Sequence, residues 1–152
     1  MIKKRAYLDS EFSSLNRYTC RLISLAIVVS DGAEFYIELT DTWTKKECSD
    51  FVQKIVLPQL NLSLYGRTCE QARAELHAFL CALGPVEVFS DAPDWDWPLL
   101  LQLVGARGLP ADVELRQIPE DLEVICAYDE PPHHALLDAR HLARMLEHSK
   151  LT

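Results

Sequence analysis

The sequence predicts an α/β fold in which a mixed sheet of antiparallel and parallel strands is flanked by helices. Three strand-like segments come first, at residues 5–10, 22–29 and 35–39, and a tight-turn dipeptide separates the last two. After residue 44 the pattern changes to helices that alternate with short strands. A strand meander followed by helix–strand–helix units is typical of a sheet with helices on its faces. We therefore expect one domain over residues 1–152.

The second segment, residues 22–29, is a nearly unbroken apolar run, which predicts a strand buried on both faces of the sheet. Asp31-Gly32 follows, and this dipeptide tolerates the positive φ of a hairpin turn. Residues 35–39 then return as a third strand. The first three strands are therefore expected to form an antiparallel meander.

Two capping-box signals open the first predicted helices. Thr44 and Thr68 are each followed three residues later by a Glu or Gln that can reach back to the helix N-terminus. The first helix is predicted to run to Pro58. The second runs through Leu83, where Gly84-Pro85 stops it.

The remaining elements follow the same alternation. We expect a short strand at 86–89, a helix from about residue 95 to 104, a strand at 113–118 and a last helix over about 134–148. An apolar stripe along the last helix indicates the face that packs on the sheet.

The composition excludes several classes of protein. Of the 152 residues, 49% are apolar and 25% are charged, which excludes disordered and low-complexity chains. No stretch approaches the ~18 apolar residues of a membrane span, and residues 1–9 do not form a secretory signal. The five cysteines are odd in number and form no C-x-x-C, so we expect reduced, buried thiols. They are Cys20, Cys48, Cys69, Cys81 and Cys126. These features predict a cytoplasmic protein without membrane contacts.

The net charge of −8 lies entirely in the C-terminal half, where residues 77–152 hold 5 basic and 13 acidic side chains. A chain that wraps a long duplex needs basic stripes to neutralise phosphates. The sequence therefore argues against duplex wrapping, but it is compatible with binding one end of a nucleic acid if cations screen the acids.

Acidic residues gather at three places. Asp9 and Glu11 lie two residues apart on the first strand, so both carboxylates point to the same face. Two like charges held together favour a divalent cation with oxygen ligands. The alternative is a solvated surface pair.

The second place is Asp91-Ala92-Pro93-Asp94-Trp95-Asp96-Trp97, between a strand and a helix. Asp91 and Asp94 could simply cap that helix, whereas Asp96 lies inside it. The two tryptophans could belong to the core or could stack on bases. The third place joins His133, His134 and Asp138 at the start of the last helix, where a His–Asp pair could also be only a structural hydrogen bond.

The order of these clusters resembles the three exonuclease motifs of the DEDDh 3′→5′ exonucleases, which have a ribonuclease H-like fold. The C-terminal run His133-His134-Ala135-Leu136-Leu137-Asp138-Ala139 is similar to their H-x-A-L-x-D-A motif. Trp95-Asp96 stands where Phe-Asp is more usual, and Glu11-Phe12-Ser13-Ser14-Leu15 stands where many members have E-T-T-G-L. The resemblance spans about residues 6–145. Residues 56–60 and 138–142 resemble the RNase AS-type exoribonucleases, small bacterial homodimers that trim adenylate-rich RNA 3′ ends.

This resemblance implies a 3′→5′ exoribonuclease that acts on single-stranded RNA 3′ ends with two Mg²⁺ ions, for which Mn²⁺ could substitute. Asp9 would bridge both ions, and Glu11, Asp96 and Asp138 would complete the set of metal ligands. His133, rather than His134, would be the general base, because its spacing to Asp138 matches the motif. Phe12, Ser13 and Leu15 would contact the terminal nucleotide, although Phe12 and Leu15 could equally be ordinary core residues.

Two other functions fit the same residues. One is a 3′→5′ exonuclease for single-stranded DNA, which the motifs do not separate from an RNA enzyme. The other is a catalytically inactive module that binds nucleic acid or a protein. Such a module would be expected to lack one of the acids or the histidine, and this sequence has all of them.

Overall fold

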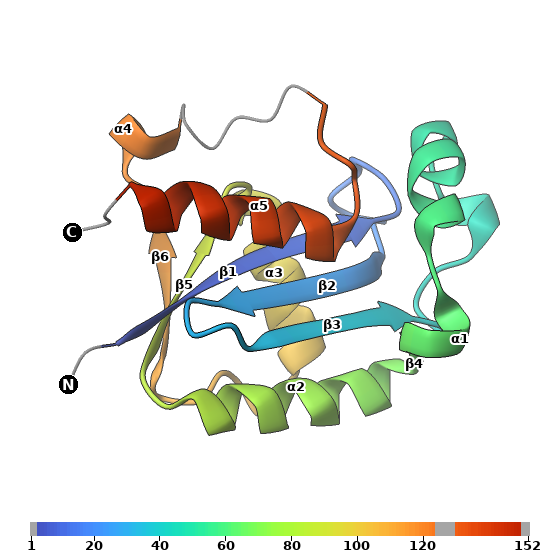
Figure 1. The fold of residues 1–152 in the computed structure, drawn as a ribbon. Coiled ribbons are helices and arrows are strands. Elements are labelled where there is room, and N and C mark those ends of the chain that lie inside the picture. The colour runs from blue at the N-terminus through green and yellow to red at the C-terminus, as the bar shows by residue number, and fades with distance from the viewer. Residues whose placement is uncertain (1–2, 124–129, 150–152) are drawn as a thin grey trace.

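The computed structural model describes residues 3–123 and 130–149, which form a six-stranded mixed sheet flanked by helices (Figure 1). The strand order is β4-β3-β2-β1-β5-β6. The strands are β1 (Lys4–Phe12), β2 (Leu22–Val29), β3 (Glu34–Leu39), β4 (Gly66–Arg67), β5 (Val86–Ser90) and β6 (Val113–Gln117). β1, β2 and β3 are antiparallel, whereas β4, β5 and β6 pair in parallel with their neighbours. The predicted fold class is confirmed.

The meander forms as its sequence predicts. All eight residues of β2 are buried, and Gly32 takes a φ of 96° at the turn into β3. β2 is an inner strand of the sheet with helices over both faces, which is why its apolar run has no polar alternation.

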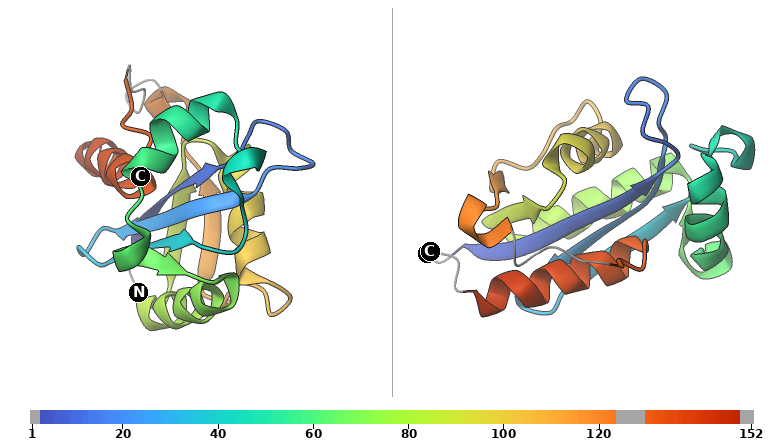
Figure 2. Two further views of the ribbon diagram at one scale, coloured as in Figure 1. Left: turned by 90° about the vertical axis from the view of Figure 1, so that its right-hand side faces the viewer. Right: turned by 90° about the horizontal axis from the view of Figure 1, so that it is seen from above.

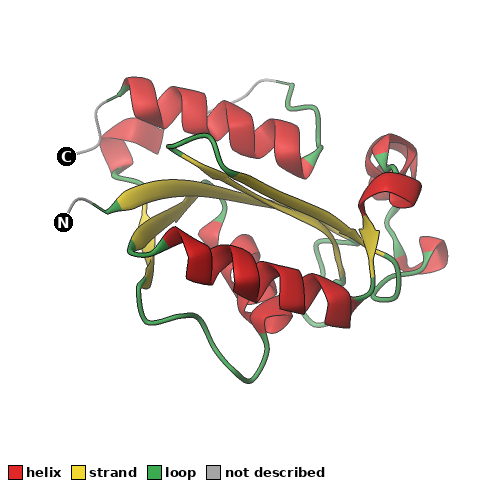
Figure 3. Cartoon of the chain, turned by 60° about the horizontal axis from the view of Figure 1, so that its bottom comes forward, coloured by secondary structure: helices red, strands yellow, loops and turns green. Residues whose placement is uncertain are grey.

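Helices cover the two faces of the sheet unequally (Figures 1 and 3). α5 (Ala135–His148) lies along one face, and α2 (Cys69–Leu83) and α3 (Pro93–Val104) lie on the other. Ala6 and Leu8 of β1 pack into the core on the α2–α3 side, whereas Tyr7 packs beneath α5. Because side chains alternate along a strand, Asp9 and Glu11 share the α5 side with Tyr7.

The prediction of one continuous helix from Thr44 to Pro58 is wrong. Thr44 caps only a three-residue 3₁₀ turn, η1 (Lys45–Glu47), after which the backbone is extended at Cys48. Helical structure then resumes as a π-helical turn, η2 (Val52–Val56), and a 3₁₀ turn, η3 (Leu57–Gln59). Cys48 is buried against Ile23, Val52 and Val56, so tertiary packing overrides the local signal for a helix.

The segment from η1 to α1 (Leu62–Tyr65), here called the helical excursion, lies beside the N-terminus of α5 (Figure 2). Neither α1 nor the two-residue β4 was predicted. The capping box of Thr68 and Gln71 at α2 is present as predicted. α4 (Glu120–Glu123) is a further short helix that the sequence pattern did not indicate.

The cysteine expectation is only partly correct. Cys48 is buried, Cys20 and Cys69 are half-buried, Cys81 is exposed, and all four are free thiols. Cys126 lies outside the described residues. Within residues 3–123 and 130–149, no helix is long and apolar enough to cross a lipid bilayer.

Candidate functional site

Three carboxylates meet between β1 and the first turn of α5. Asp9 and Glu11 lie on β1, and Asp138 lies on α5, which packs across that strand. One carboxylate oxygen from each of the three lies within 4.8 Å of the others. The i, i+2 spacing on the strand is what places Asp9 and Glu11 side by side.

Asp96 approaches the same place from α3 and is held by two hydroxyl groups. Ser10 Oγ donates to its Oδ1 and Ser90 Oγ donates to its Oδ2, both at 2.6 Å. The side chain is only 1% exposed. Its orientation is therefore fixed by β1 and β5 before any ligand binds.

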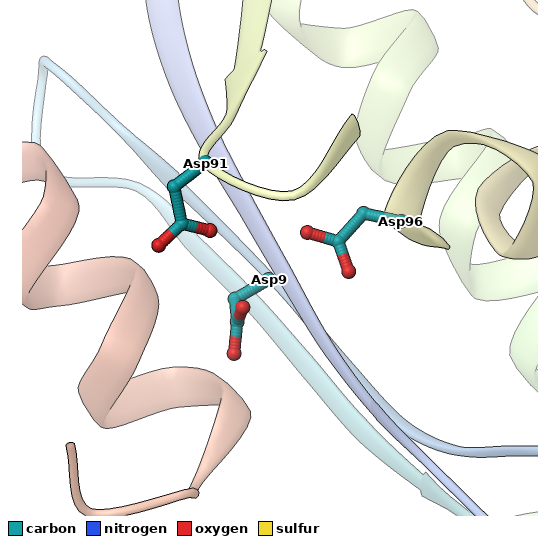
Figure 4. A group of neighbouring side chains, drawn as sticks. All are labelled: Asp9, Asp91 and Asp96. Atoms are coloured by element: carbon teal, nitrogen blue, oxygen red, sulfur yellow. The ribbon is translucent and has the colours of Figure 1, made fainter. Parts of the chain in front are cut away.

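Asp91 completes a second triad with Asp9 and Asp96, again with one oxygen of each within 4.8 Å of the others. In Figure 4 the three carboxylates come from β1, from the turn after β5 and from the start of α3, and they surround one space. The N-cap of α3 is Ala92 and no side chain makes a capping bond there, so the interpretation of Asp91 as a cap is wrong. Asp94 is exposed and belongs to neither triad.

Burial and mutual repulsion make these acids unusually hard to ionise. Burial, followed by the charges of the neighbouring acids, raises the pKa of Asp9 well above its ordinary value. Burial and the charge of Asp138 raise the pKa of Glu11 to about 8. Burial raises the pKa of Asp96 to about 7, against the opposing effect of the Ser10 and Ser90 hydroxyls, and raises the pKa of Asp138 to about 6. A cation among them would remove this penalty.

The donor set fits a hard divalent cation. Both triads consist only of carboxylates, the ligands that Mg²⁺ and Mn²⁺ prefer. Asp9 Oδ2 and Asp138 Oδ1 are buried and have no hydrogen-bond partner among the described residues. Buried, unpaired carboxylate oxygens are costly in a protein interior, and a cation would satisfy them. Asp9 is the residue that the two triads share.

The acids line a cleft of about 710 Å³ that His133 also lines. His133 precedes α5 and has a φ of +55°, in the left-handed region. Its ring meets Phe51 of the helical excursion edge-on, with ring centroids 4.8 Å apart. His134, the N-cap of α5, is turned instead toward Tyr36 of β3, and its Nε2 lies 3.3 Å from the Tyr36 hydroxyl. Burial lowers the pKa of His134.

Of the three residues predicted to contact the terminal nucleotide, one lines the cleft and the other two do not. Phe12 lines the cleft and stacks on Trp95 with ring centroids 5.1 Å apart. Leu15 is 78% exposed on the hairpin after β1, so the alternative of core packing is wrong for it. Ser13 is buried, and its hydroxyl and backbone N–H both bond to Arg21. Neither Leu15 nor Ser13 lines the cleft.

The two tryptophans of the second cluster differ as well. Trp97 is half-buried and packs against the main core. Trp95 stacks on Phe12, and the guanidinium carbon of Arg17 lies over its ring, 4.9 Å from the ring centroid.

Two residues of the cleft were missed or left open from sequence. The sequence leaves the role of Asp91 open between a helix cap and a member of the acidic cluster, and its position directly after a strand is the available signal for the second role. His141, three residues after Asp138 and therefore on the same side of α5, also lines the cleft. Arg140 of α5 makes a bidentate ion pair with Glu34, and both of its N–O distances are 2.7 Å.

Comparison with known proteins gives two kinds of likeness. The chain is 33% identical over 148 residues to 3′-5′ exoribonucleases from two strains of Mycobacterium tuberculosis, CDC 1551 and H37Rv, a match that covers 90% of this chain and 87% of theirs. No known protein-family model matches the chain.

Solved structures of exonuclease I have the same fold. The Escherichia coli enzyme, in a zinc-bound complex with single-stranded DNA, superposes with a TM-score of 0.65 at 10% identity over 95% of this chain. Exonuclease I from Methylocaldum szegediense superposes with a TM-score of 0.66 at 11% identity over 98% of this chain. The chain spans only about 40% of the length of these enzymes.

Proposed function

The chain belongs to the family of the mycobacterial 3′-5′ exoribonucleases that it matches, and we propose that it hydrolyses the terminal phosphodiester bonds of single-stranded RNA from the 3′ end. The observation that carries this proposal is the pair of carboxylate triads that share Asp9 and line one cleft. Hydrolysis of a phosphodiester adds negative charge to a group that is already anionic. Catalysis of that reaction is therefore mainly charge stabilisation.

We propose Mg²⁺ as the natural cation, with Mn²⁺ able to substitute. Asp9, Glu11 and Asp138 would hold one ion, and Asp9, Asp96 and Asp91 would face the other. When bound, two such ions supply positive charge next to the attacking and leaving oxygens of the displacement. The unpaired oxygens of Asp9 and Asp138 support this assignment.

The protein side chains would supply a proton acceptor and a surface for the last nucleotide. His133, which lines the cleft, is the proposed general base that takes a proton from the attacking water. Phe12, stacked on Trp95, offers an aromatic face to the terminal base. Exposed Leu15 would contact the base from the hairpin, and Ser13 would act by holding the hairpin closed.

On its resemblance to the RNase AS-type enzymes, we further propose that the protein acts in the cytoplasm as a homodimer. Its mass in solution, measured by light scattering, tests the dimer: twice 17.3 kDa is expected.

The activity is tested with 5′-labelled RNA and DNA oligonucleotides of one sequence, incubated with Mg²⁺, with Mn²⁺ or with EDTA. We expect stepwise shortening of the RNA from its 3′ end with either metal and none with EDTA. Asp9→Asn should be inactive. Asp94→Asn is the matched control, because Asp94 is an exposed acid near the cleft that belongs to neither triad. Undiminished cleavage in EDTA, or shortening of the DNA alone, would refute the proposal.

A further inference from the structure

We propose that Glu38, Tyr36 and Gln59 are positioning residues that hold His133 over the acidic cleft. This inference rests on the proposed role of His133 as the general base. None of the three residues lines the cleft. They act from behind it, through the segment 131–134 that leads into α5.

Glu38 is a buried carboxylate that connects two separate parts of the chain. It lies on β3 with 0% exposure, and among the described residues it forms no ion pair. Its Oε1 accepts the backbone N–H of Asn61, in the helical excursion, at 2.7 Å. Its Oε2 accepts the hydroxyl of Tyr36. A buried carboxylate is costly even when hydrogen-bonded, and an apolar side chain could support the strand as well. A role beyond folding is therefore indicated.

Tyr36 links Glu38 to the start of α5. Its ring stacks on the ring of His134 with centroids 5.1 Å apart, and its hydroxyl lies 3.3 Å from His134 Nε2. His134 in turn is the N-cap of α5, and its carbonyl accepts the backbone N–H of Asp138 at 2.9 Å. Glu38 and Tyr36 thus fix the residue that directly follows His133.

Gln59 holds the other side of the same segment. Its Nε2 donates to the carbonyl oxygens of Ile55 at 2.9 Å and Pro132 at 2.7 Å, and it lies 3.4 Å from the carbonyl of His133. Phe51 packs against the His133 ring from the same excursion. Phe51 directly precedes the π-helical turn η2, and Gln59 ends the 3₁₀ turn η3 that follows it. π-Helical turns are frequent at functional sites.

Together these contacts explain how His133 keeps a left-handed backbone, with a φ of +55°, that a residue with a side chain rarely adopts. Strained backbone of this kind persists only where its surroundings enforce it. The helical excursion and His134 hold the backbone of His133 from its two sides, and Glu38 connects them. Glu38 bonds to Asn61 of the excursion and to the Tyr36 hydroxyl, which lies beside His134.

The test compares Gln59→Ala, Tyr36→Phe and Glu38→Gln with Gln53→Ala. Gln53 is a matched control, because its amide donates a hydrogen bond to the Cys48 carbonyl in the same excursion and forms no hydrogen bond to the described segment 131–134. Gln59 is exposed, so Gln59→Ala remains informative if the buried variants fold poorly. We expect kcat on RNA to fall by about 10- to 100-fold in the three variants, the loss typical of a misplaced catalytic group. KM and the calorimetric affinity for Mn²⁺ should stay unchanged, and Gln53→Ala should match the parent.

The deciding measurement repeats Gln59→Ala in a His133→Ala background. If Gln59 acts through His133, the double variant is no slower than His133→Ala alone. Losses that multiply would show a general structural role and overturn the proposal, as would an unchanged kcat in Gln59→Ala. Full activity of His133→Ala would refute the base assignment and the positioning role together, while metal-dependent shortening of RNA would still stand.

Discussion

The hydroxyl of Ser10 donates a 2.6 Å hydrogen bond to Oδ1 of Asp96 and so connects β1 to the first turn of α3. Ser90, at the end of β5, occupies the other oxygen of the same carboxylate at an equal distance. One of these hydroxyls comes from β1, which is distant in sequence, and the other from β5, which directly precedes α3, and together they fix one buried acid. Groups that orient a metal ligand in this way tune its affinity for the metal.

Removal of either hydroxyl should weaken cation binding. For Ser10→Ala and Ser90→Ala we expect Mn²⁺ affinity, measured by isothermal titration calorimetry, to fall by about 10- to 100-fold. Ser63→Ala is the control, because Ser63 is exposed on α1 and bonds only to Asn61 among the described residues. Parental affinity in both variants would show that the two hydroxyls do not tune the affinity of Asp96 for the cation.

Asp9→Asn should stabilise the cation-free protein while it abolishes activity. The amide removes a carboxyl group whose ionised form is disfavoured in the folded state, first by burial and then by the charges of Asp96, Glu11, Asp138 and Asp91. We expect a higher melting temperature in EDTA, by about 2–4 °C for each kcal/mol gained. Activity on RNA should fall on the order of 1,000-fold, because charge stabilisation of the transition state is lost. A lower melting temperature in EDTA would contradict the electrostatic account of the cluster.

Arg140 should matter little for activity. Its guanidinium is engaged by Glu34 in a bidentate pair at the edge of α5, and both side chains are partly exposed. For Arg140→Ala we expect at most about 1 kcal/mol of lost unfolding free energy, measured by urea denaturation, since exposed ion pairs contribute little. KM for RNA should be unchanged. A KM increase of tenfold or more would show that Arg140 leaves Glu34 to bind phosphate.

Much of the fold could be predicted because local signals and tertiary environment agree. The apolar run at 22–29, the Asp31-Gly32 turn and the Thr68 capping box each form the expected element. Four acids of the cleft were predictable by a different route. A strand places Asp9 and Glu11 on one face, but Asp in the first turn of a helix is common for electrostatic reasons. The resemblance to the exonuclease motifs is what selected Asp96 and Asp138.

The helical excursion could not be predicted, because its shape depends on contacts with residues distant in sequence. The capping box at Thr44 predicts a continuous helix, but the burial of Cys48 beside Ile23 interrupts that helix. The role of Asp91 was hidden in the same way. Its spacing suits a helix cap as well as a ligand, and only the placement of Asp9 opposite it distinguishes the two.

The site also predicts an unusual dependence of stability on pH. The pKa values of Asp138, Asp96 and Glu11 are raised by burial to about 6, 7 and 8, above those of the unfolded chain. The folded state therefore binds more protons than the unfolded state from the ordinary pKa values of 3.8 and 4.5 up to about pH 8. The stability that these groups contribute is full only below their unfolded pKa values, and it is lost as pH rises through the folded pKa values.

Divalent cations should cancel this loss, because they favour the ionised carboxylates. In EDTA we expect the unfolding free energy to fall between pH 5 and 8.5, by up to about 1.4 kcal/mol per pH unit for each proton released. Saturating Mg²⁺ should therefore raise the melting temperature by several degrees at pH 8 and by much less at pH 5. Differential scanning fluorimetry at both pH values measures the rise in melting temperature that Mg²⁺ causes. Groups outside the cleft titrate in the same way with and without Mg²⁺, so they do not contribute to this rise. Asp94→Asn should behave as the parent does, whereas Asp9→Asn should lose most of the cation-dependent rise. An equal rise at pH 5 and pH 8 would show that cation binding is not linked to the ionisation of these acids.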